Sequence, residues 1–477
     1  MTRGRLPLLT RVVYGSGDWS LSSFNTFRQV FYAAFLTDVV GLDARLASLA
    51  ALVGVAWDAV NDPLVGMWSD RLRTRWGRRR PLMVAFAVPF GFAFVALWWA
   101  PPWQSQWALA LHVALAYMLT DTLQSLVTVP FFALTPELTS DHDERTSLTA
   151  WRMGFNLLAS LAVAVFAPVI VDSMVRAGYA PQQGYLAGGV LFGALGVVPP
   201  LLIAATVRER VDGLPDSSPS VRDTLRATWA NVPFRYLVVL YLLNWITFDL
   251  VGLMIPYFVT WWLGAGDATV QLSLGPVRLP VESAMLGALL VVAVAAVPLW
   301  SWLAQRLEKK VAYALAMVGW LAVQLVVAWV QPGQYGLAVL AASLCGFGVA
   351  AAHVIPDAML PDVIDADELA TGVRNEGTYY GARNLFRKAA GAVAVFVALQ
   401  VLGWSGYVTG APAGSAQPEA AILAVRVLTG PMGAVLLAGA IAAALAYPMT
   451  RARHREVVAA LAERQRSVAY PPGPDRG

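Results

Sequence analysis

The chain has 477 residues, of which 58% are hydrophobic and 13% are charged. This composition is far more apolar than that of a soluble globular domain, and it indicates a protein that crosses a membrane several times. The net charge of +4 is typical of anchoring charge beside a membrane rather than of nucleic-acid binding. A single cysteine, Cys345, excludes a disulfide framework within one chain.

We predict an all-α protein with about twelve transmembrane helices, because a span needs about 20 mostly apolar residues. The first and eleventh apolar stretches carry many polar side chains and should score weakly by hydropathy, as expected of helices that line a wet cavity. The N-terminus lacks the features of a removable signal peptide, so the first helix should serve for insertion. The stretches are centred near residues 27, 57, 91, 120, 160, 196, 248, 292, 321, 347, 392 and 434.

The distribution of Lys and Arg predicts the orientation. Basic residues gather before the first span, between spans two and three, after spans six and eight, and in the tail. With twelve spans these segments share one side, and the positive-inside rule places that side in the cytoplasm. We therefore expect an integral protein of the cytoplasmic (inner) membrane with both termini in the cytoplasm.

The spans fall into two halves. Residues 208–233 are polar and contain Pro and Ser, so they predict a cytoplasmic linker between a bundle at 1–207 and a bundle at 234–450, with a cytoplasmic tail at 451–477. "PLVGMWSDRL" from Pro63 and "PLWSWLAQRL" from Pro298 each end a span and each place Arg eight residues after Pro. Weak internal symmetry of this kind is typical of a two-half transporter.

Two acids lie inside the second span. Asp58, Asn61 and Asp62 are spaced so that a helix brings all three close to one face. Burying one carboxylate in hydrocarbon costs about 2.5 to 3.5 kcal/mol on insertion scales. Two neighbouring acids also repel unless a cation or a proton lies between them, and carboxylate and amide oxygens suit a hard cation. We interpret the group as a cation-coupling site; the alternative is structural pairing with Arg or Lys of other helices.

A charged segment follows where the second span meets the cytoplasm. Gly66 would allow a close approach of helices. Asp70 at a helix C-terminus is unfavourable for the helix dipole unless an arginine compensates it. We predict that Gly66, Asp70, Arg71 and Arg78 form a gate, whereas simple anchoring would explain the arginines alone.

The pattern from Gly66 to Arg80 resembles the loop 2–3 signature of the major facilitator superfamily. More narrowly, "WDAVNDPLVG", "YGSGDW", "FYAAFLTDVVGL" and "MLPDVIDADELATGVRNEGTYYG" resemble the glycoside-pentoside-hexuronide:cation symporters, the melibiose permease group. The similarity covers nearly the whole chain. It implies the major facilitator fold, twelve helices in two pseudo-symmetric six-helix bundles around a cavity, and alternating access. It also implies symport of a sugar, glycoside or hexuronide with Na⁺, H⁺ or Li⁺.

The resemblance also implies roles for single residues. Asp58, Asn61 and Asp62 match the cation-site positions of the family. Lys388 matches an eleventh-helix lysine near that site, and Arg152 matches a fifth-helix arginine that helps to bind sugar. The predicted coupling ion is Na⁺ or H⁺, with no other cofactor and no resident metal.

Three positions depart from the melibiose permease. Ser22 stands where that protein has a sugar-binding Asp, Thr128 stands where it has another Asp, and Phe132 replaces a stacking Trp. These changes put galactoside specificity in doubt. Thr128 is included in the predicted cation site, which therefore comprises Asp58, Asn61, Asp62 and Thr128.

The charge of the solute is left open by the sequence. Arginine binds carboxylate, phosphate or sulfate through its planar fork, so several arginines facing one cavity would suit a hexuronide or a sulfated sugar. Internal pairing of these arginines with Asp18, Asp121 or Asp249 is an equal alternative. The predicted substrate site comprises Asp18, Trp19, Ser22, Arg28, Asp121, Phe132, Arg152, Tyr379 and Lys388.

Other classes of function are less consistent with the sequence. We find no nucleotide loop, zinc-protease motif or nucleophile elbow, so we do not expect an enzyme. A passive channel suits two-half symmetry less well than alternating access does. The remaining alternative is a lysophospholipid, amphiphile or organic-anion symporter, because a related branch of the superfamily keeps similar acids. We expect a monomer whose partners are a small solute and membrane lipid, with no nucleic acid.

Overall fold

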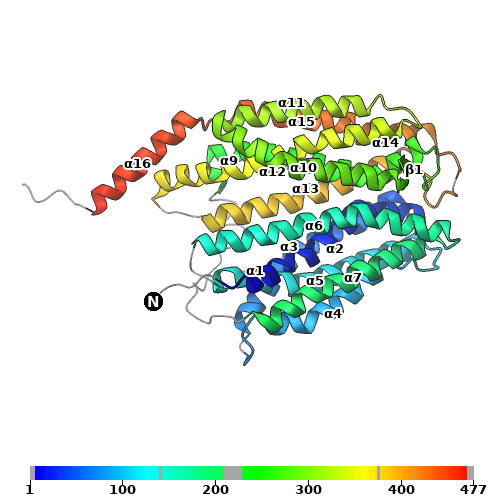
Figure 1. The fold of residues 1–477 in the computed structure, drawn as a ribbon, viewed down its shortest axis with the longest axis horizontal. Helices are drawn as coiled ribbons and strands as arrows, with labels where there is room; N and C mark the ends of the chain where they lie inside the picture. The colour runs from blue at the N-terminus through cyan, green and yellow to red at the C-terminus, as the bar shows by residue number, and fades with distance from the viewer. Residues whose placement is uncertain are drawn as a thin grey trace, which may run out of the picture.

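The computed structural model describes residues 6–72, 74–138, 142–207, 228–372, 376–412 and 414–469. Nearly all of these residues are helical, and the long helices lie side by side in two groups (Figure 1). The first group contains α1 (Leu8–Gly15), α2 (Gly17–Ala34), η1 (Phe35–Val39), α3 (Ala44–Arg71), α4 (Arg80–Leu97), α5 (Gln106–Leu138), α6 (His142–Arg176) and α7 (Pro181–Thr206).

The second group begins after the predicted linker, of which residues 208–227 lie outside the described part of the chain. Its first helix begins at Val232, two residues before the predicted boundary. The division into two bundles at these boundaries stays a prediction. The group contains α9 (Val232–Tyr257), η2 (Phe258–Leu263), β1 (Gln271–Leu274), β2 (Val277–Pro280), α10 (Val281–Arg306), α11 (Lys309–Val327), α12 (Tyr335–Thr371), α13 (Glu376–Trp404), α14 (Glu419–Thr429), α15 (Pro431–Leu445) and α16 (Arg451–Ala469).

All twelve predicted centres lie inside long helices, with α14 and α15 together forming the last. Ten described segments are long and apolar enough to cross a membrane by length and composition. The two others are α2, as predicted, and α5, where Thr120, Asp121, Thr122 and Gln124 interrupt the apolar pattern. The expectation for the eleventh helix was wrong, because the alanine-rich second half of α13 outweighs its basic start.

The two groups contact each other through equivalent helices. The first helices of each half, α2 and α9, lie against one another, and the second helix of each half packs against the fifth helix of the other, as α3 with α13 and α10 with α6. The repeated motif also behaves as predicted, because α3 ends at Arg71 and α10 ends at Arg306. This exchange of equivalent contacts indicates a pseudo-two-fold axis between two six-helix halves.

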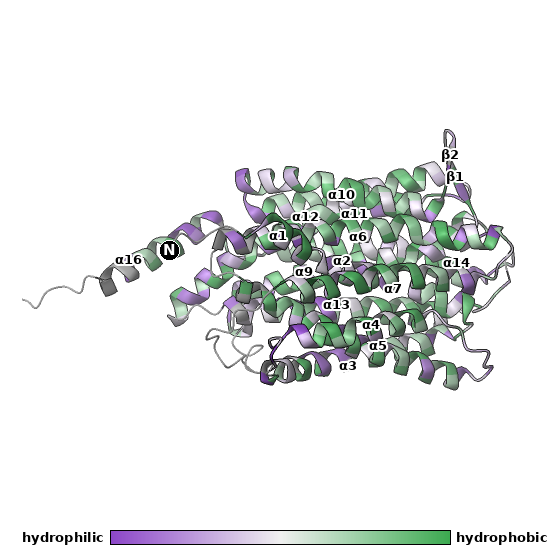
Figure 2. Cartoon of the chain, turned by 60° about the horizontal axis from the view of Figure 1, so that its bottom comes forward, coloured by the Kyte–Doolittle hydropathy of each residue, from purple (hydrophilic) through white to green (hydrophobic). Residues whose placement is uncertain are grey.

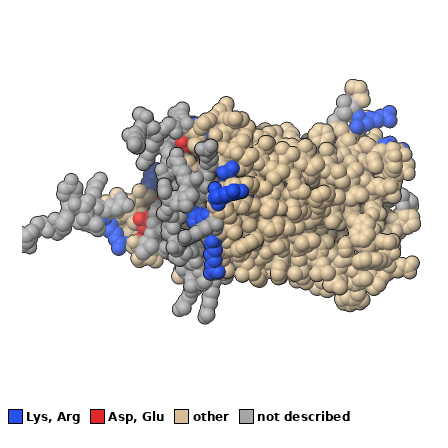
Figure 3. Space-filling view, turned by 90° about the horizontal axis from the view of Figure 1, so that it is seen from below, with Lys and Arg blue, Asp and Glu red and all other residues tan. Residues whose placement is uncertain are grey.

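The molecule has two distinct ends. We call the end that carries the N-terminus and α16 the terminal end, and the end that carries the β1–β2 hairpin the hairpin end (Figure 1). Between them the helices are mainly hydrophobic (Figure 2), and the face drawn in Figure 3 shows Lys and Arg only beside the two ends. An uncharged belt between charged ends is what a bilayer requires of an integral membrane protein.

Glycine brings α7 close to its neighbours in the first half. The Phe27 ring stacks on Trp98, with centroids 4.1 Å apart. A Cβ at Gly189 would lie 2.6 Å from the Trp98 ring, and a Cβ at Gly196 would lie 2.4 Å from the Phe24 ring. Small residues therefore let α7 pack directly on the aromatic core, as they do in other membrane helix pairs.

Candidate functional site

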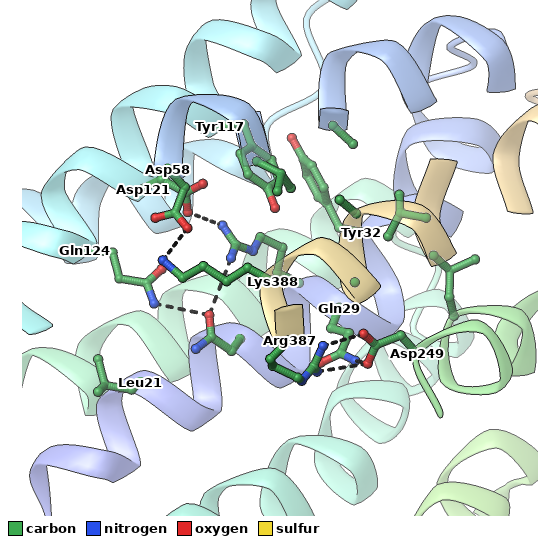
Figure 4. A pocket seen from close by; sticks show the side chains of 18 of the residues that line it. Leu21, Gln29, Tyr32, Asp58, Tyr117, Asp121, Gln124, Asp249, Arg387 and Lys388 are labelled. Carbon is green, nitrogen blue, oxygen red and sulfur yellow. Dashed lines mark hydrogen bonds and ion pairs between the residues drawn. The ribbon is translucent and has the colours of Figure 1, made fainter. Parts of the chain in front are cut away.

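A cavity of about 470 Å³ lies between the two halves (Figure 4). Its walls come from α2, α3, α5 and α6 of the first half and from α9 and α13 of the second. The lining follows α2 and η1 from Asp18, near the terminal end, to Leu36, near the hairpin end, which is roughly 27 Å along a helix. Charged and amide side chains that lower the hydropathy of α2 and α5 therefore face this cavity, among them Arg28, Gln29, Asp121 and Gln124.

The two acids of the second span meet a lysine from the other half. The Lys388 ammonium on α13 lies 2.6 Å from Oδ2 of Asp58 (Figure 4) and also contacts Oδ2 of Asp62. All three side chains line the cavity, and that of Lys388 is 41% exposed. One ammonium faces two carboxylates, so this group retains one negative charge.

A hydroxyl group from α5 contacts these acids, and it belongs to Ser125 rather than to Thr128. The Ser125 hydroxyl donates to Oδ1 of Asp62 at 2.5 Å, whereas Thr128 lines the cavity without a hydrogen bond to any described acid. The reason is the register of α3 and α5, which places Asp62 beside Ser125, one turn before Thr128. Asn61 is buried outside the lining, and its Nδ2 has no hydrogen-bond partner among the described residues.

No three described His, Cys, Asp or Glu side chains lie close enough together to hold a metal ion. A cation bound here would therefore depend on the carboxylates of Asp58 and Asp62 and the hydroxyl of Ser125. These oxygens suit a hard monovalent ion or a proton.

A second ion pair lies beside this group. The Arg28 guanidinium on α2 donates to Oδ1 of Asp121 on α5 at 2.5 Å and lies 4.5 Å above the Tyr117 ring. Asn25 accepts hydrogen bonds from Arg28 at 3.4 Å and from Gln124 at 3.1 Å. These polar side chains form one continuous network on the wall of the cavity.

A third ion pair lies within the second half, and a hydrogen bond links it to the first half. Arg387 on α13 donates to both oxygens of Asp249 on α9, at 2.6 and 3.0 Å. The side-chain amide of Gln29 on α2 donates to Asp249 as well (Figure 4). The Arg387 guanidinium lies 3.8 Å from the centre of the Trp245 ring, which fixes its orientation. Arg387 and Lys388 are consecutive on α13, and they contact α9 and α3, respectively.

The predicted sugar-binding residues gather nearer the terminal end. Arg152 on α6 donates to Oδ2 of Asp18 at 2.6 Å and lies 4.6 Å above the Phe132 ring. Asp18 and Phe132 line the cavity with Arg152 behind them. Ser22 also lines it and accepts a hydrogen bond from Asn156.

Two predicted substrate residues lie elsewhere. Tyr379 is buried and its hydroxyl accepts a hydrogen bond from Asn231 at 3.0 Å, with its ring edge-on to Phe234. Trp19 is absent from the lining. Both residues lie on helices that line the cavity, but neither side chain is part of the lining. We remove both residues from the candidate site.

The predicted gate residues are only partly described. A Cβ at Gly66 would meet Val129 at 3.9 Å, an ordinary contact, so the expected need for glycine there is wrong. The close approach of α3 and α5 occurs at Gly54 instead. Arg71 is exposed, Arg78 takes part in an interaction, and the side chain of Asp70 lies outside the described residues.

The hairpin end is closed by hydrogen bonds across the two halves. Asp38 on η1 accepts from the Tyr407 hydroxyl at 2.6 Å, from the Trp261 indole at 3.3 Å and from Thr37 at 2.8 Å. Burial raises the pKa of Tyr407, which keeps its hydroxyl a donor. The sequence reading did not assign Asp38 a role. Further cross-bundle bonds at this end join Thr37 to Tyr257, Gln400 to Ser48, Thr409 to Gly41, Ser283 to Val165, Gln271 to Asp172 and Arg176 to Thr269.

Known proteins resemble this chain over nearly its whole length. An uncharacterized symporter of Synechocystis sp. is 30% identical, over 97% of this chain and 98% of that protein. A proposed glycoside/cation symporter of Escherichia coli is 26% identical over 94% of each chain. A sodium-dependent lysophosphatidylcholine symporter of Danio rerio is 25% identical, over 94% of this chain and 87% of that protein.

Solved structures share the fold. A bacterial homologue of the human lysosomal transporter Spinster superposes with a TM-score of 0.65 at 13% identity, over 96% of this chain and 99% of that one. The family model described as MFS/sugar transport protein matches residues 13–451. The chain therefore belongs to this family of the major facilitator superfamily, whose members named here are symporters.

Proposed function

We propose that this protein is a cation-coupled symporter that carries a neutral sugar or glycoside by alternating access. The terminal end faces the cytoplasm of a bacterial-type inner membrane, as the positive-inside rule expects. The observation that carries the proposal is the group of Asp58, Asp62 and Lys388, whose charges join the two halves on the wall of the cavity.

The cation acts by competing with Lys388. A Na⁺ ion or a proton between Asp58 and Asp62 neutralises the charge that holds the ammonium, and Ser125 supplies a further oxygen. Lys388 is then released from α3, and one link between the halves is lost. Because a ligand shifts a conformational equilibrium only by binding one state better, this exchange gives the cation a direct effect on the cycle.

The charge balance of the cavity favours a neutral solute. Each arginine expected to meet an anion is paired with an acid, as Arg28 is with Asp121 and Arg152 is with Asp18. An anionic solute would have to break one of these pairs and leave a carboxylate unpaired in a low dielectric, which is costly. Hydroxyl groups of a sugar could instead share the amides and hydroxyls of Ser22, Asn25, Gln29, Gln124 and Asn156.

A lysophospholipid is the second candidate. The similarity to a lysophosphatidylcholine symporter is one reason. The other is the apolar wall at the hairpin end of the cavity, where an acyl chain could lie. This wall is formed by Leu36, Ala47, Ala51, Val55, Val395 and Leu399.

Uptake into proteoliposomes tests the proposal. We expect a methyl glycoside to accumulate when a Na⁺ or pH gradient is imposed, and to exchange without accumulation when neither is present. A matched glucuronide should be carried at least tenfold less well. Accumulation of lysophosphatidylcholine but of no sugar would replace the proposal by its alternative, and accumulation without any cation gradient would reject cation coupling.

A further inference from the structure

The ion pair of Arg28 and Asp121 lies directly beside the proposed cation site. Arg28 comes from α2 and Asp121 from α5, and both line the cavity. Asp121 is 5% exposed, and its carboxylate lies 2.5 Å from the guanidinium. The Tyr117 ring beneath the guanidinium and the Asn25 oxygen beside it hold Arg28 in place. This pair is therefore a fixed part of the wall.

The register of α3 and α5 brings this pair next to the cation site. Ser125 contacts Asp62, and each has an acid one helical turn before it, Asp121 on α5 and Asp58 on α3. Asp58 and Asp121 consequently lie side by side, as Figure 4 shows. Both Asp58 and Lys388 are close enough to act electrostatically on Asp121. The two ion-paired groups thus form a single charge cluster.

The cluster carries one uncompensated negative charge. Its acids are Asp58, Asp62 and Asp121, and its bases are Arg28 and Lys388. Arginine stays protonated at any physiological pH, and its fork is committed to Asp121. Lysine is instead a compact point charge on a flexible stem, and Lys388 is partly exposed. Within the cluster, Lys388 is the base that can move aside, whereas Arg28 stays.

We propose that Arg28 sets the number of cations carried in each cycle. By permanently neutralising Asp121, it leaves room for one monovalent cation in a cluster that would otherwise attract two. An uncompensated charge inside a membrane protein costs free energy, so each unpaired carboxylate in the cluster favours the binding of one cation. This inference rests on the proposed function, because it specifies the coupling of the same site.

A series of charge variants tests the inference in proteoliposomes. The cations carried per solute are obtained from the cation gradient that just balances an opposing solute gradient. The wild type should carry one, R28Q should carry two, and the neutralised pair R28Q/D121N should return to one. D121N alone leaves no uncompensated charge, so its solute flux should lose its dependence on the cation gradient.

A control separates the cluster from arginine pairs in general. Arg383 is paired with Asp357 outside the cavity lining, so R383Q should still carry one cation. Equal cation numbers in wild type, R28Q and R28Q/D121N would overturn the inference while leaving symport intact. A wild type whose solute flux ignores every cation gradient would instead overturn the proposed function, and the inference with it.

Discussion

Two regions of this protein hold acids between the two halves, and each region stabilises its acids with a different kind of partner. In the cavity, Asp58 and Asp62 meet a charged partner, the partly exposed ammonium of Lys388. At the hairpin end, Asp38 meets neutral donors, the hydroxyl of Tyr407 and the indole of Trp261. Both arrangements cross the interface, but the first lies on a cavity wall and the second lies in the closed end.

The difference bears on how an intramembrane acid should be interpreted. A carboxylate held by an ammonium can exchange that partner for another cation, because both are compact positive charges. A carboxylate held by neutral donors loses hydrogen bonds when it is protonated or moved, and gains nothing from a cation that cannot reach it. The cavity acids are therefore suited to coupling, and Asp38 is suited to holding one conformation closed.

The largest expected effect separates these two roles by the same substitution at each site. Asp62→Asn should abolish cation-driven accumulation, because the remaining Asp58 is fully neutralised by Lys388 and no charge is left for a cation. Asp38→Asn should preserve accumulation, although the rate can change. Solute accumulation in proteoliposomes under a Na⁺ or pH gradient measures both, with insertion checked by protein content.

Full accumulation by the Asp62→Asn variant would remove this residue from the coupling site. Loss of accumulation in both variants would show that the two regions do not differ as argued. The comparison is sharp because neither substitution changes side-chain size.

A smaller effect concerns the solute. Arg152→Ala should weaken solute binding by about tenfold or more, equivalent to about 1.4 kcal/mol, because Asp18 loses the partner that positions it in the cavity. Arg383→Ala removes a comparable ion pair outside the cavity lining and should leave binding unchanged. Solute titration of the purified variants measures this difference. Equal affinity of the Arg152→Ala variant and the wild type would exclude Arg152 from the substrate site.

Asp38→Asn should also shift the equilibrium between molecules that are closed and molecules that are open at the hairpin end. Asp38→Asn weakens hydrogen bonds to a charged acceptor, each worth about 1.5 to 3 kcal/mol. A loss of about 1 kcal/mol raises the open fraction about fivefold. A cysteine introduced at Ser48, which accepts from Gln400 across the interface, reports the change through maleimide labelling. The native Cys345 is buried, so it should contribute little to the labelling. An unchanged labelling rate would mean that Asp38 does not hold this end closed.

The sequence predicted the helices better than the contacts between them. Each of the twelve centres predicted from apolar stretches and basic residues lies inside a long helix, because burial in lipid imposes a strong pattern on each helix separately. The sequence also drew attention to Asp58 and Asp62, because burying a carboxylate in hydrocarbon costs free energy and such residues are rare in a membrane helix. The sequence did not predict the contact of Ser125 with Asp62, because this contact depends on the register of α3 and α5, which no pattern within a single helix records.

The sequence also did not predict the direction in which each side chain points. Tyr379 and Lys388 lie on the same helix, and only the packing of α13 decides that one faces Asn231 and the other the cavity. Asp38 was passed over because its partners, Trp261 and Tyr407, lie more than 200 residues away in the chain. Pairing of the cavity arginines with acids was left open for the same reason.

A third acid, Asp43, extends the comparison to the surface and gives the smallest effect. It caps α3, accepting from the Arg45 backbone at 2.9 Å. Its slight burial acts to raise its pKa, but hydrogen bonds from the Arg45 side chain and backbone outweigh this, and the pKa of Asp43 is lowered. Its charge therefore stabilises the fold above about pH 4, and this contribution is lost as the pH falls through the lowered pKa.

Asp43→Ala should lower the free energy of unfolding by about 1 kcal/mol, and Asp43→Asn should lower it by less, because asparagine still caps the helix. Thermal unfolding in detergent at pH 7 and pH 2 should show the wild type losing its advantage over Asp43→Asn at the lower pH, and an advantage that persists in full there would mean that the charge of Asp43 contributes nothing.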